Sequence, residues 1–245
     1  MRDFRRPLAC LLLVAASTAT VLAHTPVEFL EVIAVEPARM IEHAVDLKSK
    51  FDPEKVQTDL QGPVMFARSV GCMGRAANNQ PAYLNWFKIV KPAGEPVREL
   101  SVLDMVRGDG SKSLKIQNAE YLLSPSQLIT SGTPDEIPDG LDHYKAYRII
   151  DASALDRKVT LTNSVGPAQR TLGKPIFVCL AVREWHHDEY FSATHPSDCF
   201  VVYELDAHDQ EQKFSTIDQF GLNELQSTEN RWLCVRAALL RTTSN

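Results

Sequence analysis

The chain has 245 residues, 44% of them hydrophobic and 23% charged, which is enough to form a sizeable apolar core. Its net charge of −5 is mild and its Lys and Arg residues are scattered, so the composition argues against nucleic-acid binding. Gly108-Asp109-Gly110 lacks the following helix that a phosphate-binding loop requires, and the sequence implies no cofactor.

The first 23 residues have the pattern of a secretory signal peptide. A basic start over Met1–Arg6 precedes an apolar run over Leu8–Leu22, and small residues lead to a predicted cleavage after Ala23. The run is too short, and too rich in Ala, Ser and Thr, for a membrane span of about 20 residues. We therefore predict a secreted or periplasmic protein with no membrane span after cleavage.

Residues 24–82 form an N-terminal segment with mixed patterns. The β-branched content of Val27–Val35 is typical of a strand or of a buried entry segment. Over Pro37–Val45 the apolar residues have near-helical spacing after a proline, which favours a short helix. Lys55–Phe66 resembles a partial copy of the repeats that follow.

Residues 83–245 form a predicted β-repeat domain. In its clearest unit, Tyr144–Ile150, Arg157–Asn163 and Pro175–Leu180 have the β-branched content, alternation and Gly/Pro boundaries of strands. The same order of residues recurs after it, with landmarks that are 55 or 56 positions apart: Gly166 and Gly221, Cys179 and Cys234, Tyr147 and Tyr203. A fixed period of this size indicates tandem structural repeats.

The predicted fold is all-β, with antiparallel strands in about three tandem pseudo-repeats of roughly 55 residues, arranged as a sandwich or barrel-like. The units cover about residues 83–127, 141–182 and 198–238. The links over Ser124–Gly140 and Arg183–Asp198 are rich in polar residues and are predicted to be surface connections. Two pairs of matching residues should be buried: Ile149 with Leu205, and Val159 with Phe214.

The repeat residues resemble an uncharacterised bacterial secreted repeat domain, a domain of unknown function. Its copies contain the motifs D-H-Y-K-C-Y, V-T-L-x-D-Q-F-G and L-C-x-P. Here Asp142–Tyr147 carries the first motif with Ala146 in place of its cysteine, Ile217–Gly221 carries the second, and Leu233-Cys234 begins the third. The resemblance covers roughly Tyr83–Ala238 and implies no assigned activity.

Four cysteines follow the predicted cleavage site, and an even number in an exported chain favours two disulfide bonds. Cys179 and Cys199 are close in sequence, and a short loop raises their chance of meeting. Cys72 and Cys234 then form the second predicted pair. Pairing of Cys179 with Cys234, or of Cys72 with Cys199, is the alternative.

The segment Glu184–Tyr190 contains two histidines and three carboxylates, with a third histidine nearby. Imidazole and carboxylate groups of this kind can bind zinc, and the candidate ligands are His186, His187, Asp188 and His195. The spacing is poor, because adjacent residues of a strand point to opposite sides and H-E-x-x-H is missing. A solvated loop is the favoured interpretation.

Other polar and aromatic residues favour structural roles. Asp104, Asn163 and Asp218 occupy the same place in three units, where an Asx residue caps its own turn; calcium binding is the alternative. His143 begins a repeat strand and is predicted to pack or to form hydrogen bonds rather than to act in a catalytic triad. The repeated aromatics are predicted to be core residues rather than a sugar-stacking platform: Phe87, Tyr147, Tyr203, Phe177 and Trp232.

The favoured function is that of an exported, non-catalytic β-repeat module that binds a partner or has a structural role. An envelope protein or a glycan is the expected partner. The alternative is a metal-dependent hydrolase that uses the loop with His186, His187 and His195. A purely structural part of an envelope assembly is the third hypothesis.

Overall fold

The structure is a computed structural model that describes residues 27–77, 80–92, 94–108, 110–209 and 211–243. The predicted signal peptide lies outside the described residues. The described part of the chain is all-β, as predicted, and it includes no helix of the length and apolarity needed to cross a membrane.

All pairings between the strands are antiparallel, and the strands differ widely in length. In chain order they are β1 (Phe29–Pro37), β2 (Ile41–Lys48), β3 (Val56–Ser69), β4 (Gly71–Cys72), β5 (Tyr83–Ile89), β6 (Arg98–Asp104), β7 (Lys112–Thr130), β8 (Thr133–Pro134), β9 (His143–Ile150), β10 (Arg157–Asn163), β11 (Gly166–His186), β12 (Glu189–Phe191), β13 (Asp198–Asp209), β14 (Lys213–Asp218) and β15 (Gly221–Thr243). The longest three, β7, β11 and β15, have 19, 21 and 23 residues.

The helix predicted over Pro37–Val45 is wrong. Ile41–Lys48 is strand β2, which pairs with β3 along one edge and with β11 along the other. Val45 and Leu47 alternate toward the core, and the residues between them are only partly buried. The apolar spacing suits both structures locally, and the pairing with two neighbouring strands selects the extended one.

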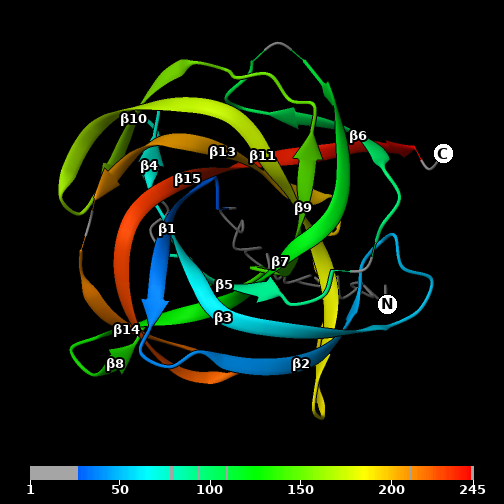
Figure 1. The fold of residues 1–245 in the computed structure, drawn as a ribbon. Helices are drawn as coiled ribbons and strands as arrows, with labels where there is room; N and C mark the ends of the chain where they lie inside the picture. The colour runs from blue at the N-terminus through cyan, green and yellow to red at the C-terminus, as the bar shows by residue number, and fades with distance from the viewer. Residues whose placement is uncertain (1–26, 78–79, 93, 109, 210, 244–245) are drawn as a thin grey trace, which may run out of the picture.

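Eight of the strands close into a ring. Their order is β1, β3, β5, β7, β9, β11, β13 and β15, and β15 pairs back with β1. Figure 1 shows these strands curving around a common centre, with the first and last strands side by side. The sheet therefore closes on itself, as in the barrel-like alternative, and the eight-strand ring has no free edge.

The chain repeats one arrangement in four successive groups: β1–β2–β3, β5–β6–β7, β9–β10–β11 and β13–β14–β15. In each group the first and third strands pair in the eight-strand ring, and the middle strand forms a hairpin with the third. Three middle strands also pair with a strand of the opposite group: β2 with β11, β6 with β15, and β14 with β7. The fourth, β10, pairs with the short strand β4, which directly follows β3 of the opposite group. We call these middle strands crossing strands.

Alternation along the ring strands divides the core into two faces. The inner face holds one apolar cluster that includes Trp86, Phe177, Tyr144 and Phe200. The outer face holds a larger cluster, to which the crossing strands β2, β6 and β10 contribute residues such as Leu47, Leu100 and Leu161. Both faces of the ring are thus buried, which explains why its strands have continuous rather than alternating apolar character.

The predicted core residues are mostly confirmed. Phe87, Tyr147, Tyr203 and Phe177 are fully buried, and Trp232 is half-buried against the inner cluster. Ile149, Leu205 and Val159 are buried as well, but Phe214 is only partly buried. Phe214 lies on β14, where the crossing strand borders two surface hollows.

The aromatic group at the centre of the eight-strand ring should dominate its stability. Phe177 is fully buried, and its benzene ring lies 5.5 Å from that of Tyr121 and 5.4 Å from that of Trp232. We expect Phe177→Ala to lower the free energy of unfolding by about 3–5 kcal/mol, measured by urea denaturation. Val165→Ala, at an 84% exposed position, should change it by less than about 0.5 kcal/mol. Equal effects of the two substitutions would contradict the burial described here.

Candidate functional site

The crossing strand β14 closes a second, smaller ring with β1, β3, β5, β7 and β15, which we call the six-strand ring. Part of its interior is apolar and includes Phe66, Tyr83 and Leu225. The rest contains buried polar side chains from four of its strands: Asn85, Ser124, Ser126, Thr216 and Asn223. Polar groups here replace the apolar residues that the other crossing strands cover, so this part of the fold is the first place to look for a site.

Asp218 ends β14 and joins its turn to the six-strand ring. Its Oδ1 accepts a hydrogen bond from the Phe220 backbone N–H at 2.8 Å, and its Oδ2 accepts from Asn85 Nδ2 at 2.7 Å. Asp104 and Asn163 accept backbone hydrogen bonds in the same way, so the predicted capping of three matching turns is confirmed. Asp104 also accepts a hydrogen bond from the Tyr203 hydroxyl at 2.7 Å, whereas the Asn85 contact of Asp218 fixes its turn against β5.

Gln219, the next residue, bonds to two strands that are distant in sequence. Its Oε1 lies 2.9 Å from His143 Nε2, and its Nε2 donates to Glu184 Oε1. Because an amide oxygen can only accept, neutral His143 carries its proton on Nε2. Glu184 Oε2 lies 3.6 Å from the same His143 nitrogen and has no hydrogen-bond partner, although Glu184 is fully buried. The arrangement joins β9, β11 and the β14–β15 turn through one amide.

Burial shifts the acid–base properties of this cluster. It raises the pKa of Glu184 to about 8, and the nearby charge of Asp218 raises it further while the Gln219 hydrogen bond lowers it. It also raises the pKa of Asp218 to about 6, against the hydrogen bonds from Asn85 and Phe220, and lowers the pKa of His143 to about 4. At neutral pH, Glu184 and His143 are therefore mainly uncharged and Asp218 is mainly ionised.

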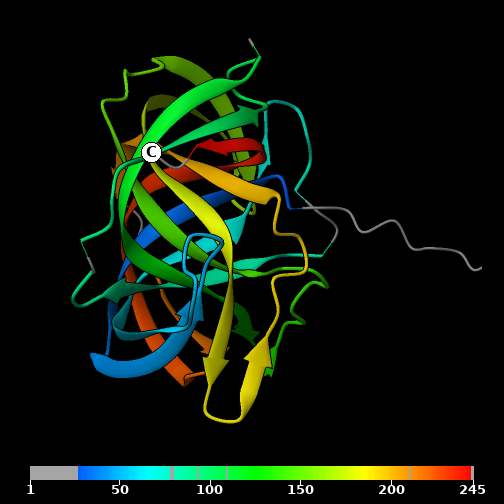
Figure 2. The same ribbon diagram turned by 90° about the vertical axis from the view of Figure 1, so that its right-hand side faces the viewer.

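A cavity of about 510 Å³ opens beside this cluster, and we call it the His143 cavity. Its lining includes His143, Asp218 and Gln219 on one side and Tyr190 and Phe191 of β12 on the other. The Phe191 benzene ring packs on the His143 imidazole at 4.7 Å, whereas Tyr190 is 53% exposed. Figure 2 shows the yellow β11–β12 hairpin that brings Tyr190 and Phe191 here, projecting from the body of the protein.

Asp142 supports the wall of the His143 cavity. Its Oδ1 accepts hydrogen bonds from the backbone N–H and Oγ1 of Thr194, at 2.8 and 2.6 Å, and its Oδ2 accepts from the His195 backbone N–H at 2.9 Å. These bonds fix the segment that follows β12 against the start of β9. Asp142 is buried, so it has a structural role and also leaves its negative charge near the cavity.

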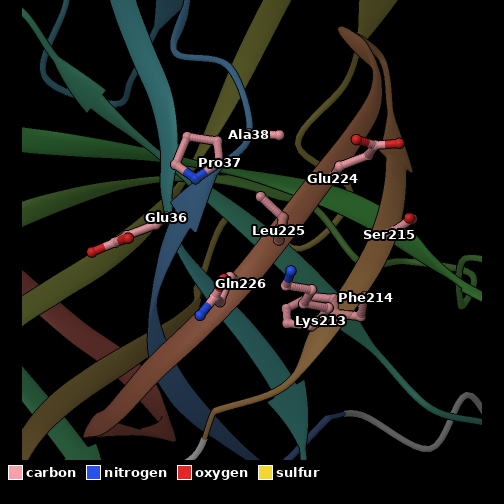
Figure 3. Close-up of a pocket in the computed structure, with 9 residues that line it drawn as sticks. All are labelled: Glu36, Pro37, Ala38, Lys213, Phe214, Ser215, Glu224, Leu225 and Gln226. Carbon is pink, nitrogen blue, oxygen red and sulfur yellow. The ribbon is translucent and has the colours of Figure 1, made fainter.

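A second hollow of about 510 Å³ lies at the end of β1, over β14 and β15 (Figure 3). Leu225 and Phe214 form its apolar part, and its charged residues Glu36, Lys213 and Glu224 are exposed. In Figure 3 the carboxylates of Glu36 and Glu224 point to opposite sides, away from Leu225. This hollow therefore has the shape of a site but not the converging buried polar groups of the His143 cavity.

The candidate metal ligands of the histidine-rich loop, for which a solvated loop was the favoured interpretation, lie in two separate segments. His186 and His187 lie at the β11–β12 turn with their imidazoles 4.2 Å apart. His195 lies in a different segment, where its Nδ1 is 3.0 Å from Thr194 Oγ1. Among the described residues, no group of three or more His, Cys, Asp or Glu side chains is placed to hold a metal ion. The structure thus does not bring His186, His187, Asp188 and His195 together as one group.

The predicted disulfide bonds are not formed: Cys72, Cys179, Cys199 and Cys234 are all free and buried. In the pairing of β11 with β13, Cys179 lies opposite Phe200, and Leu180 lies opposite Cys199. Because side chains alternate along a strand, Cys179 belongs to the inner cluster and Cys199 to the outer one. Cys234 and Cys72 are divided between the two clusters in the same way, so neither predicted pair can form.

The sequence did not identify Glu184, Gln219 and Asn85 as site residues. Glu184 was assigned to the surface link over Arg183–Asp198, but β11 continues to His186 and Glu184 is buried in it. The link predicted over Ser124–Gly140 likewise begins inside a strand, because β7 continues to Thr130. A signal was available in the two motifs that carry Asp142-His143 and Asp218-Gln219. Each motif has adjacent polar residues at a strand end, and the fold brings the two together at the His143 cavity.

The closed all-β fold, built from groups with one repeated arrangement, defines the protein as a β-repeat module with a polar cavity. The chain belongs to the family described as a repeat of unknown function (DUF7450), whose model matches residues 83–236. The comparison with curated proteins found no match. The comparison with solved structures also found none.

The buried Glu184 should make stability depend on pH. Its pKa is about 8 in the folded protein and about 4.5 as the ordinary value, so between these values the folded state binds the extra proton and rising pH destabilises it. Glu184→Gln removes this effect. We expect the unfolding free energy of the variant to rise relative to wild type by about 1 kcal/mol per pH unit between pH 6 and 7. His143 and Asp218 titrate in both proteins, so their contributions to the pH dependence of stability should largely cancel in the difference.

Urea denaturation at a series of pH values measures this difference. Glu189→Gln is the matched control, because Glu189 is exposed on β12. A difference between Glu184→Gln and wild type that stays constant with pH would show that Glu184 is ionised in the folded protein.

The four described cysteines should resist thiol reagents in the folded protein. Burial raises the pKa of Cys72 to about 11 and that of Cys199 to about 12, and it also raises the pKa values of Cys179 and Cys234. We expect no labelling of these thiols at pH 8 until the protein is unfolded, and then labelling of all four, measured by peptide mass mapping. A Cys179–Cys199 or Cys72–Cys234 crosslink in the non-reduced digest would contradict the separation of the two clusters, and a crosslink of any pair would contradict the free thiols.

Proposed function

We propose that the protein is a non-catalytic binding module that holds a glycan in the His143 cavity. The observation that carries the proposal is the convergence of two motif segments, Asp142-His143 and Asp218-Gln219, on one cavity that also has an exposed tyrosine. A cavity of about 510 Å³ suits a small ligand or a few sugar residues. The match to a repeat of unknown function is compatible with a binding role.

The polar groups of the cavity favour a ligand with hydroxyl groups. Gln219 is held at both ends by His143 and Glu184, and Gln127 Nε2 donates to the Asp135 carbonyl at 2.7 Å. Amides fixed in this way present their remaining donor and acceptor positions in a constant direction, which suits sugar hydroxyls. The exposed face of Tyr190 offers an apolar surface for a sugar ring.

Binding is favoured over catalysis because the acid–base groups are already engaged or shielded. Glu184 is fully buried behind Gln219 and does not line the cavity, and His143 Nε2 is bonded to Gln219. A general acid or base must instead reach the reacting atoms of the substrate. The polar cluster thus serves to position Gln219.

We also propose that the module acts outside the cytoplasm, in a periplasm or as a secreted protein. The supporting observation is the basic and apolar pattern of residues 1–23. A glycan of the cell envelope is then the expected ligand.

A glycan array followed by isothermal titration calorimetry with the best-bound oligosaccharide tests the proposed site. Loss of one aromatic stacking contact costs about 1 kcal/mol, so we expect Tyr190→Ala to weaken binding roughly three- to tenfold. Gln226→Ala, in the hollow of Figure 3, is the control and should leave binding unchanged. If Gln226→Ala abolishes binding to the array and Tyr190→Ala preserves it, the glycan binds in the second hollow instead.

A further inference from the structure

The charges around the His143 cavity all have one sign. Asp142, Glu189 and Asp218 are among the residues that line it, and none of its lining residues in the described part of the chain is Lys or Arg. His143 adds no positive charge at neutral pH, because burial lowers its pKa to about 4. A partly enclosed site lined by one sign of charge favours a ligand of the opposite sign.

Buried polar atoms without partners behind the cavity give a second observation. Glu184 Oε2 is fully buried without a partner and lies 3.6 Å from Nε2 of His143, which lines the cavity. Asn85 Oδ1 and Ser126 Oγ, in the adjoining six-strand ring, are also buried without partners. Buried polar atoms of this kind are rare in folded proteins, and their concentration here marks this part of the fold as specialised for polar contacts.

The aromatic side chains of β12 complete the set. Tyr190 is 53% exposed at the cavity, and Phe191 covers the His143 imidazole. The face of a tyrosine attracts both the apolar face of a sugar ring and a nearby cation. Carboxylates without a balancing Lys or Arg, together with an aromatic face, match a sugar that carries a positive charge.

We infer that the ligand of the His143 cavity is an amino sugar whose ammonium group lies beside Asp218 and whose pyranose ring packs on Tyr190. This inference rests on the proposed glycan-binding function and names the chemical class of the ligand. Neutral sugars lack the ammonium that the carboxylates attract, and acidic sugars are repelled by them.

Proton release offers a specific readout of a cationic ligand. The titratable groups around Asp218 are Glu184 on β11, His143 on β9, and Asp142 and Glu189 at the cavity. An ammonium group beside Asp218 lowers the pKa of that carboxyl from about 6, so ligand binding at pH 6 releases protons from Asp218. A positive charge that reaches Glu184 releases protons from Glu184 in the same way. A neutral sugar leaves these pKa values nearly unchanged.

The test compares oligomers of glucosamine with matching oligomers of N-acetylglucosamine by calorimetry at pH 6, in two buffers of different ionisation enthalpy. We expect the glucosamine oligomer to bind at least tenfold tighter, to lose affinity as salt is raised, and to release protons. Asp218→Asn should remove the preference, but it also changes the hydrogen bond from Asn85. Glu189→Gln, at an exposed position, should reduce the preference without affecting folding. Glu224→Gln, in the hollow of Figure 3, is the matched control.

Two results would overturn the inference in distinguishable ways. Equal or tighter binding of the N-acetylated oligomer, still weakened by Tyr190→Ala, would refute the amino-sugar ligand and leave the proposed glycan-binding function intact. Binding of a lysine-rich peptide, with neither sugar bound, would refute both.

Discussion

The fold depends on one constraint, which is that the eight-strand ring has apolar residues on both faces. Closing the ring buries the inner face, where Trp86 and Phe177 pack, but it leaves the outer face open to solvent. The crossing strands cover that face, and each does so by pairing with its own group and with the opposite one. The requirement to bury the outer cluster therefore also explains why opposite groups pair with each other.

The candidate site arises where this requirement is relaxed. The crossing strand β14 covers a part of β5 and β7 that contains Asn85, Ser124 and Ser126 in place of apolar residues. Its turn then supplies Asp218, which accepts a hydrogen bond from Asn85, and Gln219, which bonds to the buried His143 and Glu184. These hydrogen bonds compensate part of the cost of burying the polar groups. The compensation is incomplete, as the unpaired oxygen of Glu184 shows, and this residual cost is the physical basis for placing function here rather than in the apolar hollow of Figure 3.

The sequence predicted what depends on neighbouring residues. Strand character and the Asx-capped turns follow from local composition and agree with the structure, and the period near 55 residues is consistent with the family repeat. The helix over Pro37–Val45 failed because a local spacing was overruled by pairing with β11, which is more than 130 residues away. The disulfide pairs failed because an even number of cysteines carries no information about which face of a strand each one occupies. Both halves of the site were visible as motifs, but only the topology shows that they meet.

The crossing of strands between opposite groups also limits how such a protein can change in length during evolution. In a linear repeat array each unit contacts only its neighbours, so units can be gained or lost one at a time. Here β6 depends on β15 and β14 depends on β7, and loss of either group would strip the cover from the other. Such an architecture can be inherited, duplicated or lost only as a complete closed set. Sequence drift within a unit, such as the exchange of apolar for polar residues under β14, is then the route left open for acquiring new specificity.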